Sequence, residues 1–351
     1  MNPIALQPDQ GLQNPTDPSA DAQHPPAGLL ARTKHEAVIR GLPWITLVIA
    51  LLLGLFNRDL TQARDTIPFL VSFVFFGMPH GAMDWVVNQR LRKDSGRRGG
   101  LAGFSWYLAL MAIGGLLLLI APVVAVVAFF VLTVIHWGLG DLHATCMVAP
   151  NRVDRFAAIS GRGLLILGAA FAFDPAAAWG PFALLIGDAG ASPASIQASG
   201  AIGSVAFGIG VLATAYWVLR RWMAKDRTGA VLDALESALV VGAIALTDPL
   251  FGIGMYFLGT HSFRHSLRLA STPAVMPENG QNGSLTRRLI IVHLLSLPLL
   301  VPTFIILLGW SRFQFGGLDV MDLTVTMLGF FLVTTLPHHL LGCRLPEPRS
   351  S

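Results

Sequence analysis

The amino-acid sequence predicts an all-α fold, a polytopic bundle of transmembrane helices. Of its 351 residues, 53% are hydrophobic and only 13% are charged, whereas a soluble domain typically carries about 25% charged residues. The apolar residues occur in runs close to the roughly 20 residues that a membrane-spanning helix needs. Basic residues cluster in every second segment between these runs, as the positive-inside rule expects of cytoplasmic loops.

The apolar runs predict about ten spans, and counts from eight to twelve remain compatible with the pattern. The approximate ranges are 42–57, 67–89, 102–121, 122–142, 163–187, 201–219, 230–247, 249–270, 288–309 and 322–343. Ala121-Pro122 forms a tight turn between the third and fourth, and Asp174-Pro175 predicts a broken or re-entrant fifth span.

The distribution of basic residues predicts the orientation. They follow the second, fourth, sixth and eighth spans and the last one, which places both termini in the cytoplasm. The net charge of +4 is thereby explained by topology, and no nucleic-acid partner is expected.

Three regions are predicted. Residues 1–38 form a Pro-rich, disordered cytoplasmic tail that contains His24 and His35. Residues 39–345 form the integral membrane catalytic domain, and residues 346–351 form a short cytoplasmic tail. Cys146 and Cys343 are far apart and indicate neither a disulfide framework nor a thiolate metal site.

Histidines inside the predicted spans are the main functional signal, because ionisable groups in lipid are costly and usually functional. His80 lies in Met78-Pro79-His80-Gly81, and Asp84 follows it by one helical turn. This spacing puts both on one helix face. Asp84 is therefore predicted to accept a hydrogen bond from the second ring nitrogen of a metal-bound His80.

Two further segments carry intramembrane histidines. His136 ends an apolar run that starts at Val123, and His143 follows it nearer the membrane edge. His261 and His265 form an HxxxH pair, whose spacing points two imidazoles the same way on a helix. This pair is the most specific local signal, although HxxxH also occurs by chance.

The remaining histidines are less informative. His338 and His339 are adjacent, so they diverge by about 100° on a helix and at most one faces a shared centre. His293 has apolar neighbours and is predicted to be a packing histidine.

The histidines share one depth in this topology. His80, His136, the His261/His265 pair and His338 each lie past the middle of a span that runs from outside to inside. They are therefore predicted to converge on one metal site. Neutral imidazoles suit Fe, Zn, Cu and Ni, so the residues alone leave the metal open.

The ordered motifs resemble the Brp/Blh family of membrane β-carotene 15,15′-dioxygenases, over roughly residues 65 to 345. The motifs are Pro79-His80-Gly81-Ala82-x-Asp84, His136-Trp137-Gly138-x-x-Asp141, His261-Ser262-x-Arg264-His265 and Pro337-His338.

The resemblance implies cleavage of the central double bond of β-carotene by O₂ to give two retinal molecules. It implies non-haem Fe(II) with His80, His136, His261 and His265 as ligands, and a pocket-lining or completing role for His338. The resemblance further implies an enzyme surrounded by lipid in the inner membrane of a bacterial or archaeal cell, and its product implies a functional link to a retinal-binding rhodopsin.

Other residues are assigned to the site as hypotheses. Asp84 and Asp141 orient ligand rings or stabilise the charged centre, although Asp141 equally fits a helix-end residue at the interface. Tunnel candidates are Trp85, Trp137, Phe257 and Phe263, which also fit ordinary packing aromatics. Arg264 is expected to extend to the cytoplasmic headgroups.

Three alternatives stay open. The chain could cleave a different carotenoid, or could be another histidine-rich iron oxidase of the desaturase or hydroxylase type. Those enzymes need further HxxHH-type boxes, which are not seen here. A metal or ion transporter is the non-enzyme alternative, but such proteins often contain inverted repeats, and no internal repeat is evident.

Overall fold

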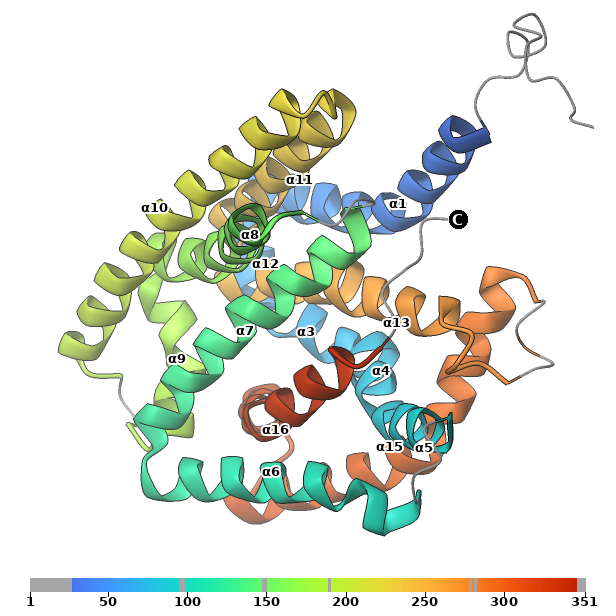
Figure 1. The fold of residues 1–351 in the computed structure, drawn as a ribbon. Helices are drawn as coiled ribbons and strands as arrows, with labels where there is room; N and C mark the ends of the chain where they lie inside the picture. The colour runs from blue at the N-terminus through green and yellow to red at the C-terminus, as the bar shows by residue number, and fades with distance from the viewer. Residues whose placement is uncertain are drawn as a thin grey trace, which may run out of the picture.

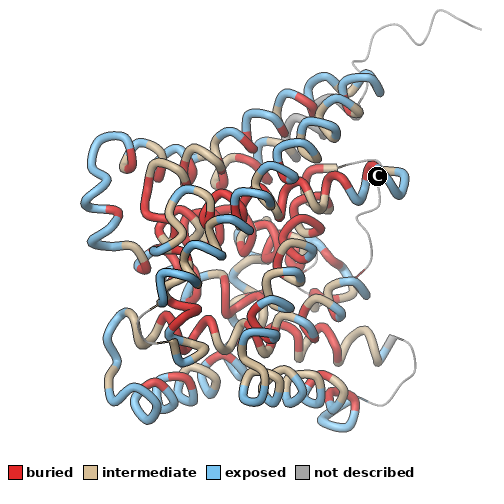
Figure 2. The backbone as a smooth tube through the Cα atoms, turned by 90° about the vertical axis from the view of Figure 1, so that its left-hand side faces the viewer, coloured by how far each residue is buried: buried red, intermediate tan, exposed pale blue. Residues whose placement is uncertain are grey.

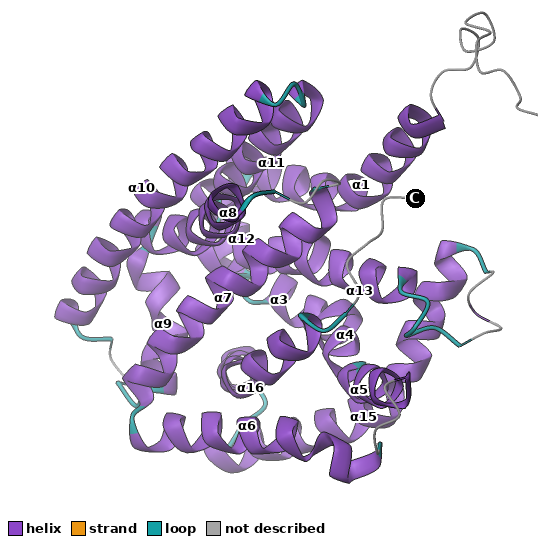
Figure 3. Ribbon diagram, viewed as in Figure 1, coloured by secondary structure: helices purple, strands orange, loops and turns teal. Residues whose placement is uncertain are grey.

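We describe the protein from a computed structural model that covers residues 27–94, 99–146, 150–188, 191–277, 280 and 283–345. Every regular element among these residues is a helix, and none is a strand (Figure 3). The predicted all-α fold is therefore confirmed.

The helices fall into two groups by length. The long ones are α1 (Ala27–Phe56), α6 (Gly100–Ile120), α7 (Pro122–Thr145), α8 (Arg152–Phe173), α10 (Pro193–Met223), α11 (Arg227–Leu246), α15 (Leu285–Phe315) and α16 (Val320–Gly342). The short ones are α2 (Arg58–Ala63), α3 (Ile67–Ser72), η1 (Phe73–Gly77), α4 (Met78–Ala82), α5 (Asp84–Asp94), α9 (Pro175–Leu185), α12 (Pro249–Tyr256), η2 (Phe257–His261) and α13 (Ser262–Ser271).

Nine helical segments among the described residues are long and apolar enough to cross a membrane. They comprise the eight long helices and the continuous segment Ile67–Lys93. The chain is therefore a multi-pass membrane protein. The predicted span over 249–270 is also helical, as α12, η2 and α13 in succession, but it is too polar to be one of the nine.

The fifth predicted span differs most from the structure. Its expected range was 163–187, but α8 already begins at Arg152, and the helix breaks at Asp174-Pro175 as the sequence indicated. Arg162, expected in a loop, is buried inside α8. Buried acidic partners, Asp141 and Glu236, explain why this arginine is tolerated there.

The predicted N-terminal tail is too long at its C-terminal end. Helix α1 begins at Ala27, so residues 27–38 are helical, and Glu36 forms an ion pair with Arg40 one turn later. Residues 1–26 and the predicted C-terminal tail at 346–351 lie outside the described residues.

The long helices have apolar residues on their outer faces. Leu119, Ile202 and Leu212 are among many large hydrophobic side chains that are exposed, whereas Glu236 and Arg264 are buried. Figure 2 shows the buried segments in the middle of the molecule and the exposed ones around its outside. This distribution fits a chain whose outer solvent is lipid.

Small residues allow the helices to approach closely, as is common in membrane bundles. A Cβ on Gly138 of α7 would lie 2.0 Å from the Ile159 carbonyl oxygen of α8, and one on Gly163 of α8 would lie 2.2 Å from the Val134 oxygen of α7. The backbones of α7 and α8 are therefore in direct contact. This crossing fixes the position of α7, which carries His136.

Helix α16 lies near the middle of the bundle (Figure 1) and packs against α6, α7, α9 and α15. Helices α4 and α13 lie beside its C-terminal half in the same view. The interior around this half of α16 is where the predicted metal-binding histidines meet.

Candidate metal centre

His80 is positioned by an irregular helix. The turn η1 before it is π-helical, with the Met78 N–H bonded to the Phe73 carbonyl five residues back. Such single π turns inside helices are frequent at functional sites. The His80 Nδ1 lies 2.7 Å from the Phe76 carbonyl oxygen, which fixes the ring and turns its other nitrogen inward.

A second π-helical turn, η2, precedes the HxxxH pair. It ends at His261, and the Ser262 N–H bonds to the Phe257 carbonyl five residues back. The extra residue rotates α13 relative to α12, so His261 and His265 both face the interior. The centroids of these two rings are 6.2 Å apart.

His136 approaches from α7 on the opposite side. Its ring centroid lies 4.9 Å from that of His261 and 6.1 Å from that of His265. The His136 Nδ1 is 3.3 Å from the Nδ1 of His339. His339 therefore contacts a candidate ligand at the edge of the centre.

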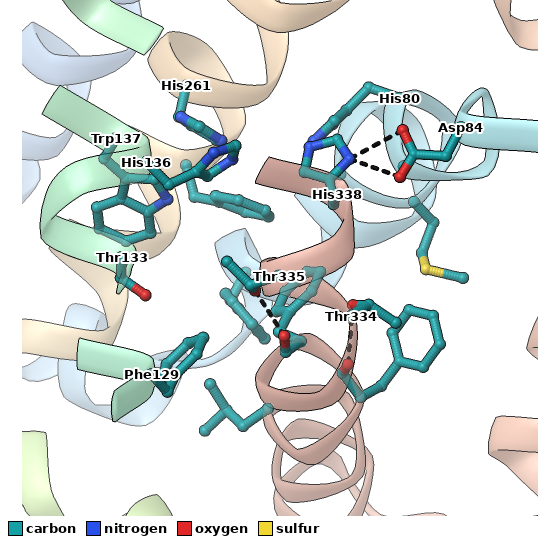
Figure 4. A pocket seen from close by; sticks show the side chains of 18 of the residues that line it. His80, Asp84, Phe129, Thr133, His136, Trp137, His261, Thr334, Thr335 and His338 are labelled. Atoms are coloured by element: carbon teal, nitrogen blue, oxygen red, sulfur yellow. Dashed lines mark hydrogen bonds and ion pairs between the residues drawn. The ribbon is translucent and has the colours of Figure 1, made fainter. Parts of the chain in front are cut away.

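The candidate ligand atoms form two overlapping groups. Ring nitrogens of His80, His265 and His338 all lie within 4.8 Å of one another, as do those of His136, His261 and His265. His265 belongs to both groups, and all five side chains are buried. The structure thus brings together all five histidines that were predicted to converge, the four expected ligands and His338. Figure 4 shows four of these five rings at one end of a pocket.

Asp84 does not pair with His80 as its spacing suggested. Its two carboxylate oxygens lie 3.0 and 2.8 Å from the Nδ1 of His338 on α16 (Figure 4). The Tyr107 hydroxyl of α6 donates to the same carboxylate at 2.6 Å. The prediction for His80 was wrong because the Phe76 carbonyl already occupies its Nδ1.

Asp141 also has partners other than the histidines. Its Oδ1 lies 2.9 Å from Arg264 Nη1, and its Oδ2 lies 3.1 Å from Arg162 Nε. The Tyr256 hydroxyl is 3.1 Å from the same carboxylate. Asp141 thus belongs to a buried charge cluster at the ends of the helices and reaches no ring of the metal centre directly.

Arg264 does not extend to the headgroups, because it is buried in this cluster. Its Nη1 and Nη2 lie 2.9 and 2.8 Å from the two oxygens of Glu236. Its Nε donates to the Ile39 carbonyl at 3.1 Å. The guanidinium therefore joins α13 to α1, α7 and α11, directly beside His265.

Glu236 is the centre of the charge cluster. Its carboxylate is fully buried and accepts from Arg264, from Arg40 at 2.7 Å and from Arg162 at 3.1 Å. The indole N–H of Trp44 donates to it at 3.0 Å. Asp233, one turn earlier, pairs with Arg40 and Arg221. Each buried charge thus has an opposite charge beside it, as burial requires.

A cavity of about 220 Å³ extends from the histidines between the helices. Its walls are almost wholly apolar, and many are aromatic: Phe69, Phe129, Phe130, Phe171, Phe182, Phe257, Phe330 and Phe331. Four of the five histidines, His80, His136, His261 and His338, also line it. The arrangement offers an apolar ligand access to a histidine-rich centre.

Two of the four tunnel candidates line this cavity. Trp137 and Phe257 do, whereas Trp85 and Phe263 do not. Trp85 packs on Phe104 with ring centroids 5.1 Å apart, and Phe263 packs on Phe76 at 5.9 Å. Both thus pack against a neighbouring aromatic ring and do not line the cavity.

The other histidines lie apart from the centre. Both ring nitrogens of His293 lie within hydrogen-bonding distance of carbonyl oxygens, those of Leu289 and Phe75, as a packing histidine requires. His143 Nδ1 lies 3.1 Å from Arg268. His24 lies outside the described residues.

With this geometry in place, the chain can be compared with known proteins. A family model described as "Beta-carotene 15,15'-dioxygenase" matches residues 71–345. The chain belongs to this family. It is also 29% identical over 252 residues to the "Probable beta-carotene 15,15'-dioxygenase Blh" of Halobacterium salinarum, which covers 65% of this chain and 68% of the relative. No solved structure matches the chain significantly.

The part of the chain that matches the dioxygenase family includes the whole histidine centre. It begins in α3 and ends at Leu345, so all five converging histidines and Asp84 fall within it. Helix α1 lies before the matched region, yet its Arg40 contributes to the charge cluster around Glu236. The cluster therefore reaches beyond the family match.

Sequence reasoning missed Tyr107, Glu236 and Arg40. For Glu236 a signal was present, because an acid within an apolar span needs a buried partner or a function. The same holds for Arg40 at the start of the first apolar run. Tyr107 gave no signal, because its partner Asp84 comes from another helix.

Proposed function

We propose that this chain cleaves β-carotene at its central 15,15′ double bond with O₂ and releases two all-trans-retinal molecules. The observation that carries this proposal is the convergence of buried imidazoles at one end of an apolar cavity, within a chain of the β-carotene 15,15′-dioxygenase family. Atoms balance in this reaction, because one carbon–carbon double bond breaks and each of its carbons gains one oxygen atom of O₂.

We further propose that Fe(II) is the metal and that His80, His136, His261 and His265 hold it. Neutral imidazole nitrogens are suitable donors for iron, and no thiolate or free carboxylate in the described residues faces the centre. When bound, ferrous iron supplies the site at which O₂ is activated. The donor set alone also suits zinc or copper, so the choice of iron rests on the proposed reaction with O₂.

The residues of the chain bind and orient the substrate. The aromatic walls exclude water and provide apolar faces for a polyene. Trp137 packs against Tyr256 with the two rings tilted, and it lies 5.7 Å from His261, ring centroid to centroid, so the substrate wall and a candidate ligand are mutually fixed. Thr133 and Thr334 also line the cavity.

The chain is proposed to lie in the cell membrane with both termini in the cytoplasm. Charged residues near the ends of α7 and α10 (Asp141 and Arg221) and in the first halves of α8 and α11 (Arg162 and Asp233) belong to the buried charge cluster around Glu236. This grouping supports the alternation of basic loops seen in the sequence.

A pigment assay tests the proposed activity. The chain is expressed in cells that accumulate β-carotene, alongside His80→Ala, His261→Ala and the control His293→Ala. We expect the wild type and His293→Ala to convert carotene into retinal, because His293 lies outside the centre. Both ligand variants should lose retinal formation to background. The measurement is pigment extraction with chromatographic quantification.

Iron-loaded wild-type protein that leaves β-carotene intact would refute β-carotene as the substrate. Conversion of another carotenoid in the same assay would move the proposal to that substrate. Two irons per chain in the purified protein would instead support an oxidase of the desaturase type.

A further inference from the structure

The ring of His338 is fixed in one tautomer. Its Nδ1 lies 2.8 Å from one oxygen of Asp84 and 3.0 Å from the other. A carboxylate only accepts hydrogen bonds, so the proton of a neutral His338 must be on Nδ1. The opposite nitrogen, Nε2, is left with a free lone pair.

That Nε2 has no hydrogen-bond partner, although it is fully buried. An unsatisfied buried acceptor is costly, and such a group in a native site calls for an explanation. The His338 ring lies 5.2 Å from His80, 5.0 Å from His265 and 5.1 Å from His136, centroid to centroid. A lone pair among other imidazoles is satisfied by a cation and by little else in this apolar surrounding.

Asp84 is itself held from a third helix. The Tyr107 hydroxyl on α6 donates to its Oδ2 at 2.6 Å, and both Asp84 and Tyr107 are buried. A carboxylate that accepts from the outer nitrogen of a histidine is the usual support for a metal-bound imidazole, because it fixes the tautomer and raises the basicity of the ring. Asp84, which accepts hydrogen bonds from both Tyr107 and His338, has this supporting arrangement.

We propose that His338 is a fifth metal-binding imidazole of the centre, and that Asp84 and Tyr107 are its positioning residues. This inference rests on one part of the proposed function, namely that a metal occupies the centre. It differs from the four-histidine ligand set implied by the family resemblance.

Chemical rescue of metal binding tests the assignment. The purified chain and a His338→Gly variant are loaded anaerobically with Fe(II) or Co(II), and affinity is measured by competition with a chelator. We expect His338→Gly to lose at least 10-fold in affinity. Added imidazole should enter the vacated space, restore most of that affinity and shift the Co(II) absorption spectrum back toward that of the wild type.

Variants of the supporting residues provide the second measurement. Asp84→Asn should lower metal affinity by about 10- to 100-fold, the usual effect of losing such a partner, and Tyr107→Phe should lower it less. In the His338→Gly background, Asp84→Asn should have no further effect, because its ligand is gone. His143→Ala, on α7 but paired with Arg268 outside the centre, is the matched control and should bind metal normally.

The proposal is overturned if His338→Gly binds metal as tightly as the wild type and with the same Co(II) spectrum. It is also overturned if imidazole fails to rescue a folded His338→Gly protein. Should that variant not fold, unchanged affinity in Asp84→Asn would overturn it instead. None of these readouts needs a carotenoid, so a chain that binds metal through His338 but cleaves no β-carotene refutes the proposed function alone.

Discussion

Glu236 is the residue that the buried guanidiniums surround, and its substitution has a clear expected effect on stability. Its carboxylate is fully buried between Arg40, Arg162 and Arg264. Glu236→Gln removes the negative charge that these three guanidiniums share, and breaking a buried pair in this way costs about 3–5 kcal/mol. We expect a large fall in the melting temperature of the detergent-solubilised protein.

A matched change elsewhere in the cluster serves as the control. Asp226 pairs with Arg221, but 28% of its side chain is exposed. It also caps α11 by accepting from the Gly229 N–H, which asparagine does equally well. Asp226→Asn should therefore cost less than about 1 kcal/mol. Equal destabilisation by both changes would mean that the cluster is not centred on Glu236.

At this scale the sequence predicted which histidines converge but not which residues support them. His80, His136, His261 and His265 could be singled out because each is an ionisable group inside an apolar run. The partner of Asp84 could not be found, since helical spacing favours His80 four residues away and the real partner is His338 on a helix 254 positions later. Long-range pairing leaves no local pattern.

At the scale of elements, the crossing of α7 and α8 predicts which glycines are indispensable. A Cβ on Gly138 or Gly163 would lie within 2.2 Å of a backbone oxygen of the facing helix. No side-chain rotation relieves such a contact, so α7 and α8 must separate. We expect Gly138→Ala and Gly163→Ala each to cost about 1–3 kcal/mol or more, measured as thermal unfolding in detergent.

The two substitutions should also weaken metal binding, because α7 carries His136 two residues before Gly138. Gly208→Ala in α10 is the control, since nothing lies within 4 Å of its added Cβ. It should leave stability unchanged or raise it by up to about 1 kcal/mol, the usual gain of alanine over glycine in a helix. Comparable losses in all three variants would contradict the close crossing.

The errors in predicting the helices have a common cause, which is that hydropathy reports neither buried ion pairs nor irregular turns. Arg152, Arg155 and Arg162 were assigned to a basic cytoplasmic loop after the fourth span, yet all three lie in the first half of α8. Ion pairs of Arg162 with Asp141 and Glu236 offset the cost of burying this arginine. The π turns before His80 and His261 were likewise invisible, because hydropathy does not report one extra residue in a turn.

At the scale of the whole molecule, the polar segment Pro249–Ser271 determines whether the chain crosses the membrane an odd or an even number of times. By hydropathy it is not among the nine candidate spans, but it lies in the interior and carries His261, Arg264 and His265, all buried. Neighbouring helices cover these residues, so the polar face of the segment is shielded from lipid. If it is counted together with the nine candidate spans, the total is ten, the number expected from the apolar runs.

Ten crossings place Cys146, after α7, and Cys343, after α16, on the same side of the membrane. Cys146 is half-buried and Cys343 is exposed, so each thiol can report its side in a variant that lacks the other. We expect a membrane-impermeant maleimide to label Cys343→Ser and Cys146→Ser variants in inside-out vesicles and neither in right-side-out vesicles, because basic loops stay in the cytoplasm. The double variant is the unlabelled control. Labelling of the two single variants from opposite sides would mean that Pro249–Ser271 does not cross, and labelling of both from outside would reverse the orientation.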